Sequence, residues 1–192
     1  MNQLELSQDF ERISACALPW DHLKGKRIFI TGATGFICGY LARALCWLNS
    51  QLSLGLSLGL FHRAGTAPTF SDPCILWVEG TMTENFIPDD IHPDIIIHAA
   101  SPANHRAICA DPVGVMDCNI LATRYLLERV CRDRSTFVFF SSGEVYQHVS
   151  EKIVERSARN LVQSGVRSFY GNSKLAGELL CERYMEEYGV DC

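Results

Sequence analysis

The sequence predicts an α/β fold in which a doubly wound parallel sheet lies between two layers of helices. Short apolar runs rich in Ile, Val, Leu and Phe recur along the chain, and buried parallel strands have this composition. Segments with helical spacing separate several of these runs. Strands that alternate with helices form parallel sheets with right-handed crossovers, so we expect a three-layer αβα arrangement.

The first half of the chain begins with a predicted strand, turn and helix. The strand is at 27–30 (RIFI), the turn at 31–35 (TGATG), and the helix follows with apolar residues at helical spacing until Asn49. The tandem LSLGLSLG at 52–59 alternates strictly and continues to His62, which predicts a second strand.

The second half of the chain contains the remaining predicted elements. Apolar runs at 74–80, 94–101 and 135–146 predict strands, and the last of these gives the strongest strand signal. Apolar side chains close to one helical face predict a helix at 111–133, and a further helix at 168–189 ends at a glycine.

The length and composition are those of one globular domain. The chain has 192 residues, 47% of them hydrophobic and 20% charged, as in ordinary globular proteins. Residues 1–24 show no clear period and are interpreted as an N-terminal arm, and residues 25–192 as the domain. The net charge of -5, with 17 Lys and Arg spread along the chain, disfavours nucleic acid as a partner.

The sequence gives no signal for a membrane, a secreted location or a metal. The apolar run at 52–61 is shorter than the roughly 20 residues of a spanning helix, and the start lacks the pattern of a secretory signal. The nine cysteines and six histidines have no metal-ligand or disulfide spacing. We therefore expect a cytoplasmic protein with free thiols and no metal.

Two glycines mark the turn between the first strand and its helix. A phosphate-binding loop occurs in this context, because the amide groups at a helix N-terminus attract anions. Gly32 permits a tight turn, and Gly35 lets the backbone approach a pyrophosphate. Any strand-to-helix connection can use glycine, so this turn by itself leaves cofactor binding open.

A set of motifs resolves this question by resemblance. The motifs are Thr31-Gly32-x-x-Gly35-Phe36-Ile37, His98-Ala99-Ala100, Asn119 with Thr123, Ser141-Ser142-Gly143-Glu144-Val145-Tyr146, and Tyr170-x-x-x-Lys174. Their order and spacing over residues 25–192 resemble extended short-chain dehydrogenases/reductases of the nucleotide-sugar epimerase/dehydratase branch. The resemblance implies a Rossmann domain that binds NAD, a nucleotide-sugar substrate and a homodimer. The family's C-terminal substrate domain has no counterpart here, so a companion C-terminal segment is the alternative partner.

The resemblance also implies a catalytic set. Tyr170 and Lys174 lie four residues apart on one helix face, where an ammonium favours the phenolate that acts as a base. Ser142 would hydrogen-bond the same substrate oxygen, and Glu144 would remove a proton from C5. Dehydratases of this branch have an Asp before the Glu, whereas decarboxylases have a small residue, as Gly143 is here. Decarboxylation is therefore favoured over dehydration; a 4-epimerase, a carbonyl reductase and a non-catalytic dinucleotide-binding module are the alternatives.

The cofactor contacts implied by the resemblance include some departures from the family pattern. The third glycine of the fingerprint is replaced by Cys38, with Gly39 one place later, and Thr81 stands where an Asp often lies near adenine. Arg63 at the end of the second strand, with no acid beside it, leaves NADP as the alternative to NAD. The implied cofactor-binding residues are Gly32, Gly35, Phe36, Ile37, Arg63, Thr81, Met82, Ala99, Ala100, Ser101, Asn119, Tyr170 and Lys174.

Overall fold

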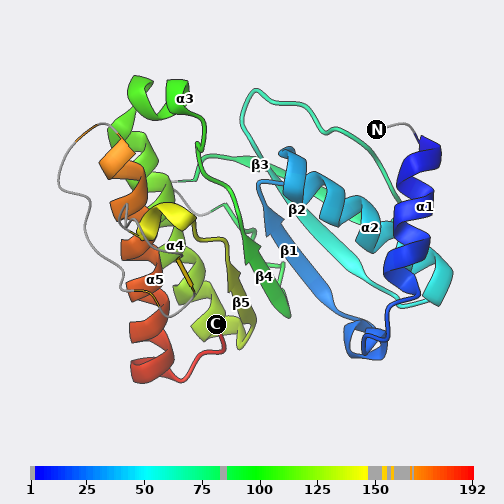
Figure 1. Ribbon diagram of the computed structural model, residues 1–192. Coiled ribbons are helices and arrows are strands. Elements are labelled where there is room, and N and C mark those ends of the chain that lie inside the picture. Colours follow the sequence, from blue (N-terminus) through cyan, green and yellow to red (C-terminus); the bar gives the residue numbers. More distant parts are fainter. Residues whose placement is uncertain (1–2, 83–85, 147–152, 155–156, 158–164, 166) are drawn as a thin grey trace.

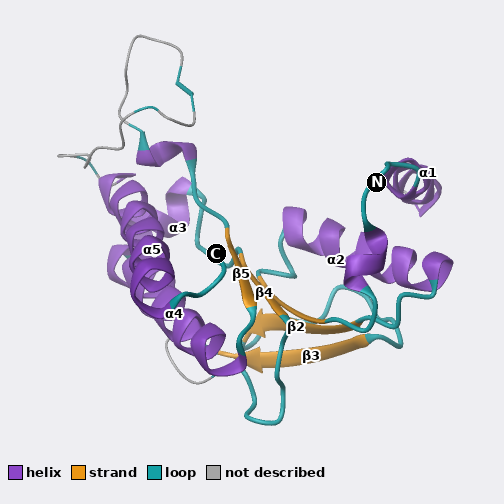
Figure 2. Ribbon diagram, turned by 90° about the horizontal axis from the view of Figure 1, so that it is seen from below, coloured by secondary structure: helices purple, strands orange, loops and turns teal. Residues whose placement is uncertain are grey.

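A parallel sheet forms the centre of the molecule, with helices on both of its faces (Figure 1 and Figure 2). The computed structural model describes the chain except for residues 1–2, 83–85, 147–152, 155–156, 158–164 and 166. Helices α1 and α2 lie on one side of the sheet and helices α4 and α5 on the other. The predicted doubly wound α/β fold is confirmed.

The sheet has five strands in the order β3-β2-β1-β4-β5. The strands are β1 (Arg27–Thr31), β2 (Ser57–Arg63), β3 (Ile75–Gly80), β4 (Ile95–His98) and β5 (Thr136–Phe139). The order reverses between β1 and β4, and ligands of open parallel sheets bind beyond the carboxyl ends of the strands at this switch point. Asp191 forms an isolated parallel bridge with Thr136, at the outer edge of β5.

The helices match the predicted segments and add two that the sequence pattern did not predict. The α-helices are α1 (Gln3–Ser14), α2 (Phe36–Leu52), α3 (His105–Ala110), α4 (Pro112–Asp133) and α5 (Arg167–Tyr188), and the 3-10 turns are η1 (Trp20–Leu23) and η2 (Gly143–Val145). Helices α1 and α3 are the unpredicted ones. Helix α1 packs on α2 through Phe10, whose ring lies 5.3 Å from Tyr40 and 6.2 Å from Trp47 between centroids.

Each strand of the sheet centre buries side chains on both faces. In β1, Ile28 and Ile30 belong to the core beneath α2, whereas Phe29 belongs to the core beneath α4 and α5. All three side chains are nearly inaccessible to solvent. This double burial explains why the strands appear in the sequence as continuous apolar runs.

The strand predicted at 135–146 is wrong beyond Phe139, because the chain leaves the sheet there. Ser142 precedes the turn η2, and its Oγ accepts a hydrogen bond from the backbone N–H of Glu144 at 3.2 Å. Serine side chains that bond to a nearby backbone amide favour turns over strands. The short strand places the Ser142 segment beyond the carboxyl edge of the sheet.

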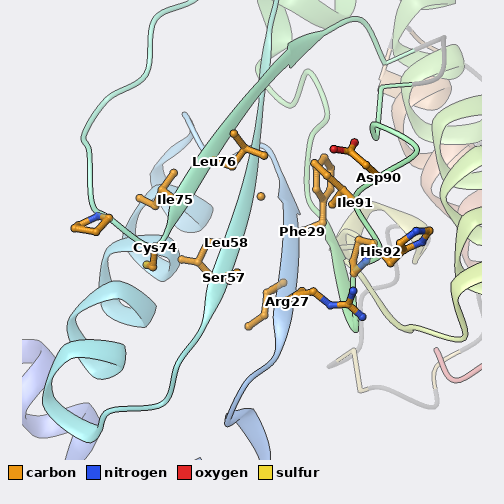
Figure 3. Close-up of a pocket in the computed structure, with 14 residues that line it drawn as sticks. Arg27, Phe29, Ser57, Leu58, Cys74, Ile75, Leu76, Asp90, Ile91 and His92 are labelled. Atoms are coloured by element: carbon orange, nitrogen blue, oxygen red, sulfur yellow. The ribbon is translucent and has the colours of Figure 1, made fainter.

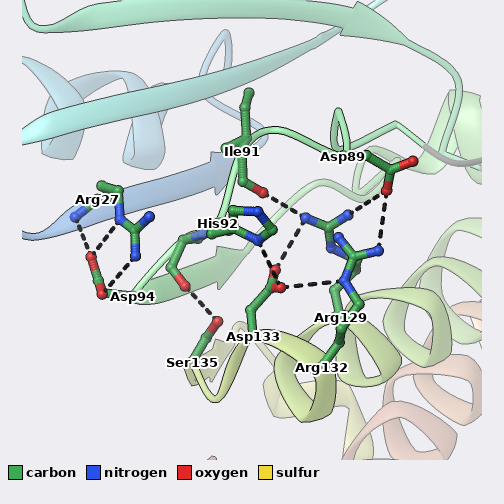
Figure 4. Close-up of polar contacts among 10 residues, drawn as sticks. Arg27, Asp89, Ile91, His92, Asp94, Arg129, Arg132, Asp133 and Ser135 are labelled. Atoms are coloured by element: carbon green, nitrogen blue, oxygen red, sulfur yellow. Dashed lines mark hydrogen bonds and ion pairs between the residues drawn. The ribbon is translucent and has the colours of Figure 1, made fainter.

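A cluster of ionic contacts fixes the segment before β4 against the end of α4 (Figure 4). Arg129 is buried and its guanidinium contacts Asp133 at 3.1 Å and the backbone oxygen of Ile91 at 2.6 Å. Arg27 at the start of β1 pairs with Asp94 at 3.0 Å. These contacts set the register of β4 beside β1, and so the relative height of their carboxyl ends.

None of the described helices is both long and apolar enough to cross a membrane.

Candidate functional site

The turn after β1 brings the backbone close to the chain that follows β4. Gly32 has a φ of +78°, and a Cβ atom added there would lie 2.9 Å from the backbone nitrogen of Ala100 and 3.0 Å from the carbonyl carbon of Ala99. Gly35 is the N-cap of α2 and donates its N–H to the Gly32 oxygen at 2.9 Å. Glycine at both positions leaves the first amide groups of α2 without a capping side chain, and such groups attract anions.

The glycine that follows this turn has the packing role expected of the fingerprint's third position. A Cβ added at Gly39 would lie 3.0 Å from the carbonyl oxygen of Ala33, so a side chain would push the helix from the turn. Cys38, which occupies the expected third position, is buried in the core beneath α2. Burial raises the pKa of its thiol to about 11, so Cys38 is a neutral packing residue.

A threonine and a histidine join the carboxyl ends of β1 and β4. The Thr31 hydroxyl accepts hydrogen bonds from the N–H groups of Ala99 at 3.2 Å and Ala100 at 3.1 Å, and contacts His98 Nδ1 at 2.8 Å. The two amide groups use both lone pairs of the hydroxyl oxygen. Thr31 therefore donates its single proton to His98 Nδ1, and the imidazole proton lies on Nε2. Burial, assisted by the charge of Lys174, lowers the pKa of His98 to about 3, which keeps the ring neutral.

Lys174 lies on the face of α5 that meets the end of β5. It is 2% exposed, and its Nζ donates to the carbonyl oxygen of Phe140 at 2.8 Å. The ammonium lies 4.8 Å from the centre of the Phe139 ring. Burial lowers the pKa of Lys174 to about 8. The side chain is thus a buried cation at neutral pH, held by one carbonyl and one aromatic face.

Asn119 of α4 connects to the start of α5 through Ser173, which is not among the predicted site residues. The Asn119 Nδ2 donates to Ser173 Oγ at 2.9 Å, and Ser173 Oγ donates to the Tyr170 carbonyl oxygen at 2.8 Å. Both Asn119 and Ser173 are fully buried. Ser173 lies next to Lys174 and three residues after Tyr170, and its position between two predicted site residues is the signal that identifies it.

Tyr170 and the turn η2 meet at the first turns of α5. Tyr170 is 8% exposed and packs with Ile108 and Val115. A Cβ added at Gly171 would lie 2.8 Å from the carbonyl oxygen of Glu144, so the missing side chain permits the close contact between α5 and η2. The structure therefore brings Tyr170 and Glu144 to the same end of the sheet as Lys174.

The remaining predicted cofactor residues lie along the carboxyl edge of the sheet. Phe36 and Ile37 are 81% and 61% exposed at the first turn of α2. Arg63 is exposed at the end of β2, and Thr81 is exposed directly after β3. The others follow β3 or β4: Met82, half-buried, and Ala99, Ala100 and Ser101. The structure brings Gly32 against Ala100, whereas Arg63 and Thr81 lie two and three strands from β4.

A cavity of about 390 Å³ lies at the amino ends of the strands (Figure 3). None of the predicted site residues is among the residues that line it. Its lining includes Arg27, Ser57 and Ile75, which begin β1, β2 and β3. In open parallel sheets the ligand site is at the carboxyl ends of the strands. The carboxyl edge is therefore the candidate functional site, and a cavity of about 640 Å³ there is lined in part by Thr34, Gly35 and Phe36.

The contact between Gly32 and Ala100 gives a testable stability difference. We expect Gly32→Ala to destabilise the fold by at least about 1 kcal/mol more than Gly25→Ala, because forcing extra atoms into a packed site costs roughly 1–3 kcal/mol. Gly25 has a similar φ of +69°, but no atom of the described residues lies within 4 Å of an added Cβ, so Gly25→Ala measures the backbone strain alone. Urea denaturation measures both variants. Equal losses of stability would contradict the close approach at Gly32.

The chain is similar in sequence to known proteins. The model described as "NAD dependent epimerase/dehydratase family" matches residues 28–192. UDP-glucuronic acid decarboxylase 2 of Arabidopsis thaliana is 26% identical over 169 residues, which are 88% of this chain and 37% of that protein. GDP-6-deoxy-D-mannose reductase of Pseudomonas aeruginosa is 30% identical over 160 residues, which are 81% of this chain and 46% of that protein.

Solved structures share the fold. The crystal structure of a dTDP-glucose 4,6-dehydratase from Streptomyces venezuelae, with NAD bound, has a TM-score of 0.72 and 22% identity. The match covers 86% of this chain and 53% of that one. The chain spans about half the length, or less, of the proteins it matches.

Proposed function

Because this chain belongs to the NAD dependent epimerase/dehydratase family, we propose that it binds NAD at the carboxyl edge of its sheet and acts on a nucleotide-linked sugar. The similar proteins named above are a UDP-glucuronic acid decarboxylase, a GDP-6-deoxy-D-mannose reductase and a dTDP-glucose 4,6-dehydratase. All three names contain a nucleotide-linked sugar. The proposed substrate class is therefore a nucleoside diphosphate sugar.

The proposal rests on the close approach of the backbone after β1 to the backbone after β4. A side chain at Gly32 would collide with the backbone of Ala100, and the free amide groups at the start of α2 suit a pyrophosphate. Bound NAD would accept a hydride from C4 of the sugar and return it in a later step. Arg63 is exposed at the end of β2 and suits a 2′-phosphate, so NADP remains the alternative.

The proposed catalytic groups are those on α5 and in the segment after β5. Tyr170 removes the proton from the C4 hydroxyl group. Lys174, whose ammonium is held by the Phe140 carbonyl, favours the tyrosinate through its positive charge. Ser142 Oγ accepts the Glu144 N–H, which leaves its own proton to donate to the substrate oxygen. Glu144 removes a proton from C5 where the reaction requires it.

The residue before Glu144 favours decarboxylation of a hexuronate over dehydration. An acid at position 143 would serve to protonate a departing hydroxyl group, and this chain has glycine there. Among the described residues, nothing lies within 4 Å of a Cβ added at Gly143, so their packing does not require the small residue. A β-keto acid loses carbon dioxide without such an acid, which is why the absence of one suits a decarboxylase.

The test is a product assay on the protein with NAD or NADP and each of three substrates: UDP-glucuronate, UDP-glucose and dTDP-glucose. We expect conversion of UDP-glucuronate to carbon dioxide and a UDP-pentose, with NAD regenerated. Loss of water from dTDP-glucose would instead indicate dehydration, and a new C4 epimer of unchanged mass would indicate epimerisation. Net conversion of NADP to NADPH, the reverse of carbonyl reduction, would indicate a carbonyl reductase. Binding of NAD without conversion of any sugar would indicate a non-catalytic module and would overturn the enzymatic proposal.

A further inference from the structure

Two cysteines and an aspartate meet on the face of the sheet that α2 covers. The Cys46 and Cys74 sulfur atoms are 3.5 Å apart, and a carboxylate oxygen of Asp72 lies within 4.8 Å of both. Cys46 is buried on α2, and the other two are half-buried in the segment that enters β3. Figure 3 shows Cys74 beside α2, and Cys74 directly precedes the first residue of β3, at the amino end of that strand.

The backbone around this cluster holds the side chains in place. The N–H of Cys74 donates to Asp72 Oδ1 at 3.1 Å, and the N–H of Ile75 donates to the Asp72 carbonyl oxygen at 3.0 Å. The carbonyl oxygen of Cys74 accepts the N–H of Leu58 in β2 at 2.8 Å. Helix α2 and the sheet thus fix both thiols and the carboxylate before any ligand binds.

We propose that Cys46, Cys74 and Asp72 form a binding site for a thiophilic divalent cation such as Zn²⁺. Thiolate and carboxylate ligands are those that Zn²⁺ accepts, with Zn–S distances of about 2.3 Å. Two sulfur atoms 3.5 Å apart then subtend an angle of about 100° at the metal, close to the tetrahedral value. A water molecule completes four-coordination. The ion joins the second half of α2 to the start of β3.

Charged groups surround the cluster. Burial, Asp72 and the neighbouring thiol raise the pKa of Cys46, and burial and Asp72 raise the pKa of Cys74. The positive charge of Arg43 acts in the opposite direction on Cys46. Arg43 stacks on the ring of Phe70, 4.0 Å from its centre. Zn²⁺ binds cysteine as the thiolate, so uptake of the metal releases protons from the ligands.

A disulfide is the competing interpretation of this pair. It would require the sulfur atoms to approach from 3.5 Å to about 2.05 Å. The carboxylate beside Cys74 opposes thiolate formation but serves as a third ligand for a cation. The donor set therefore favours a metal site.

The experiment uses the reduced protein with the exposed cysteines Cys16, Cys109 and Cys192 replaced by serine. Zn²⁺ uptake is measured by competition with a chromophoric chelator, and Co²⁺ reports sulfur ligation through its charge-transfer absorption. Three variants remove one ligand each: Cys46→Ser, Cys74→Ser and Asp72→Asn. Cys131→Ser is the matched control, because it removes a half-buried thiol outside the cluster.

We expect one equivalent of Zn²⁺, an increased melting temperature, and loss of both in the two cysteine variants. Asp72→Asn alters only a half-buried side chain and is expected to weaken binding by at least about tenfold, as loss of an outer-shell partner already does. The control keeps the site. The proposal is overturned if no equivalent binds, or if Cys46→Ser or Asp72→Asn binds as the parent does. A protein that takes up no metal is also treated with glutathione disulfide. Conversion of the pair to a disulfide, seen as a mass decrease of two hydrogens, would then replace the metal site as the interpretation and overturn the proposal.

Discussion

Replacement of Tyr170 with phenylalanine is expected to slow hydride transfer to bound NAD by at least about 100-fold, the lower range for general acid–base catalysis. The ring of Tyr170 is buried with Ile108 and Val115, and phenylalanine preserves this packing. The change removes the proposed base and leaves the turn at Gly32 intact. The affinity for NAD should therefore change far less than the rate, which separates chemistry from binding.

Absorbance of the reduced nicotinamide after mixing with a nucleotide sugar measures the rate, and fluorescence titration measures NAD binding. Tyr125→Phe is the matched control. Its hydroxyl accepts the N–H of Ile87 at 3.3 Å, so the variant loses a hydrogen bond in the core but no proposed catalytic group. A Tyr170→Phe protein that retains the rate of the Tyr125→Phe protein would refute the assignment of the base.

The sheet could be predicted because each strand has a local signal. Ile28, Phe29 and Ile30 are apolar in succession because one face packs on α2 and the other on α4 and α5. The end of β5 could not be predicted in this way. The apolar and aromatic residues from Phe137 to Tyr146 read as one strand, but the local hydrogen bond of Ser142 favours a turn.

The candidate site could be predicted only where its residues form a local motif. Gly32 and Gly35 are close in sequence, and so are Tyr170 and Lys174. The hydrogen bond between Thr31 and His98 spans 67 residues, and the one between Asn119 and Ser173 spans 54.

The Cys46–Cys74 pair is separated by 28 residues and matches no short-range ligand spacing. Such pairs are brought together by the packing of one element on another. The number of residues between two cysteines does not reveal which elements pack together, so this contact could not be predicted from the sequence.

Lys174 should give the stability of the protein a distinctive pH dependence. Burial lowers its pKa from 10.5 to about 8 in the folded state, whereas an unfolded chain restores the ordinary value. Between these two pH values the unfolded state binds more protons than the folded state, so the contribution of Lys174 to the free energy of unfolding rises with pH. Below pH 8 the cost of the buried ammonium is present in full. The shift corresponds to about 3 kcal/mol.

We expect the free-energy difference between Lys174→Met and the wild type to change by about 3 kcal/mol between pH 8 and pH 10.5, in favour of the wild type. Comparison of the two proteins cancels the titration of distant groups. Urea denaturation across this range measures the difference, and Lys24→Met, which removes an exposed lysine, is the control. A difference that is independent of pH would show that Lys174 titrates as it does in water. A pH-dependent difference would mean that the fold maintains a destabilising cation about one helical turn from Tyr170 on α5, as a base that needs a nearby positive charge requires.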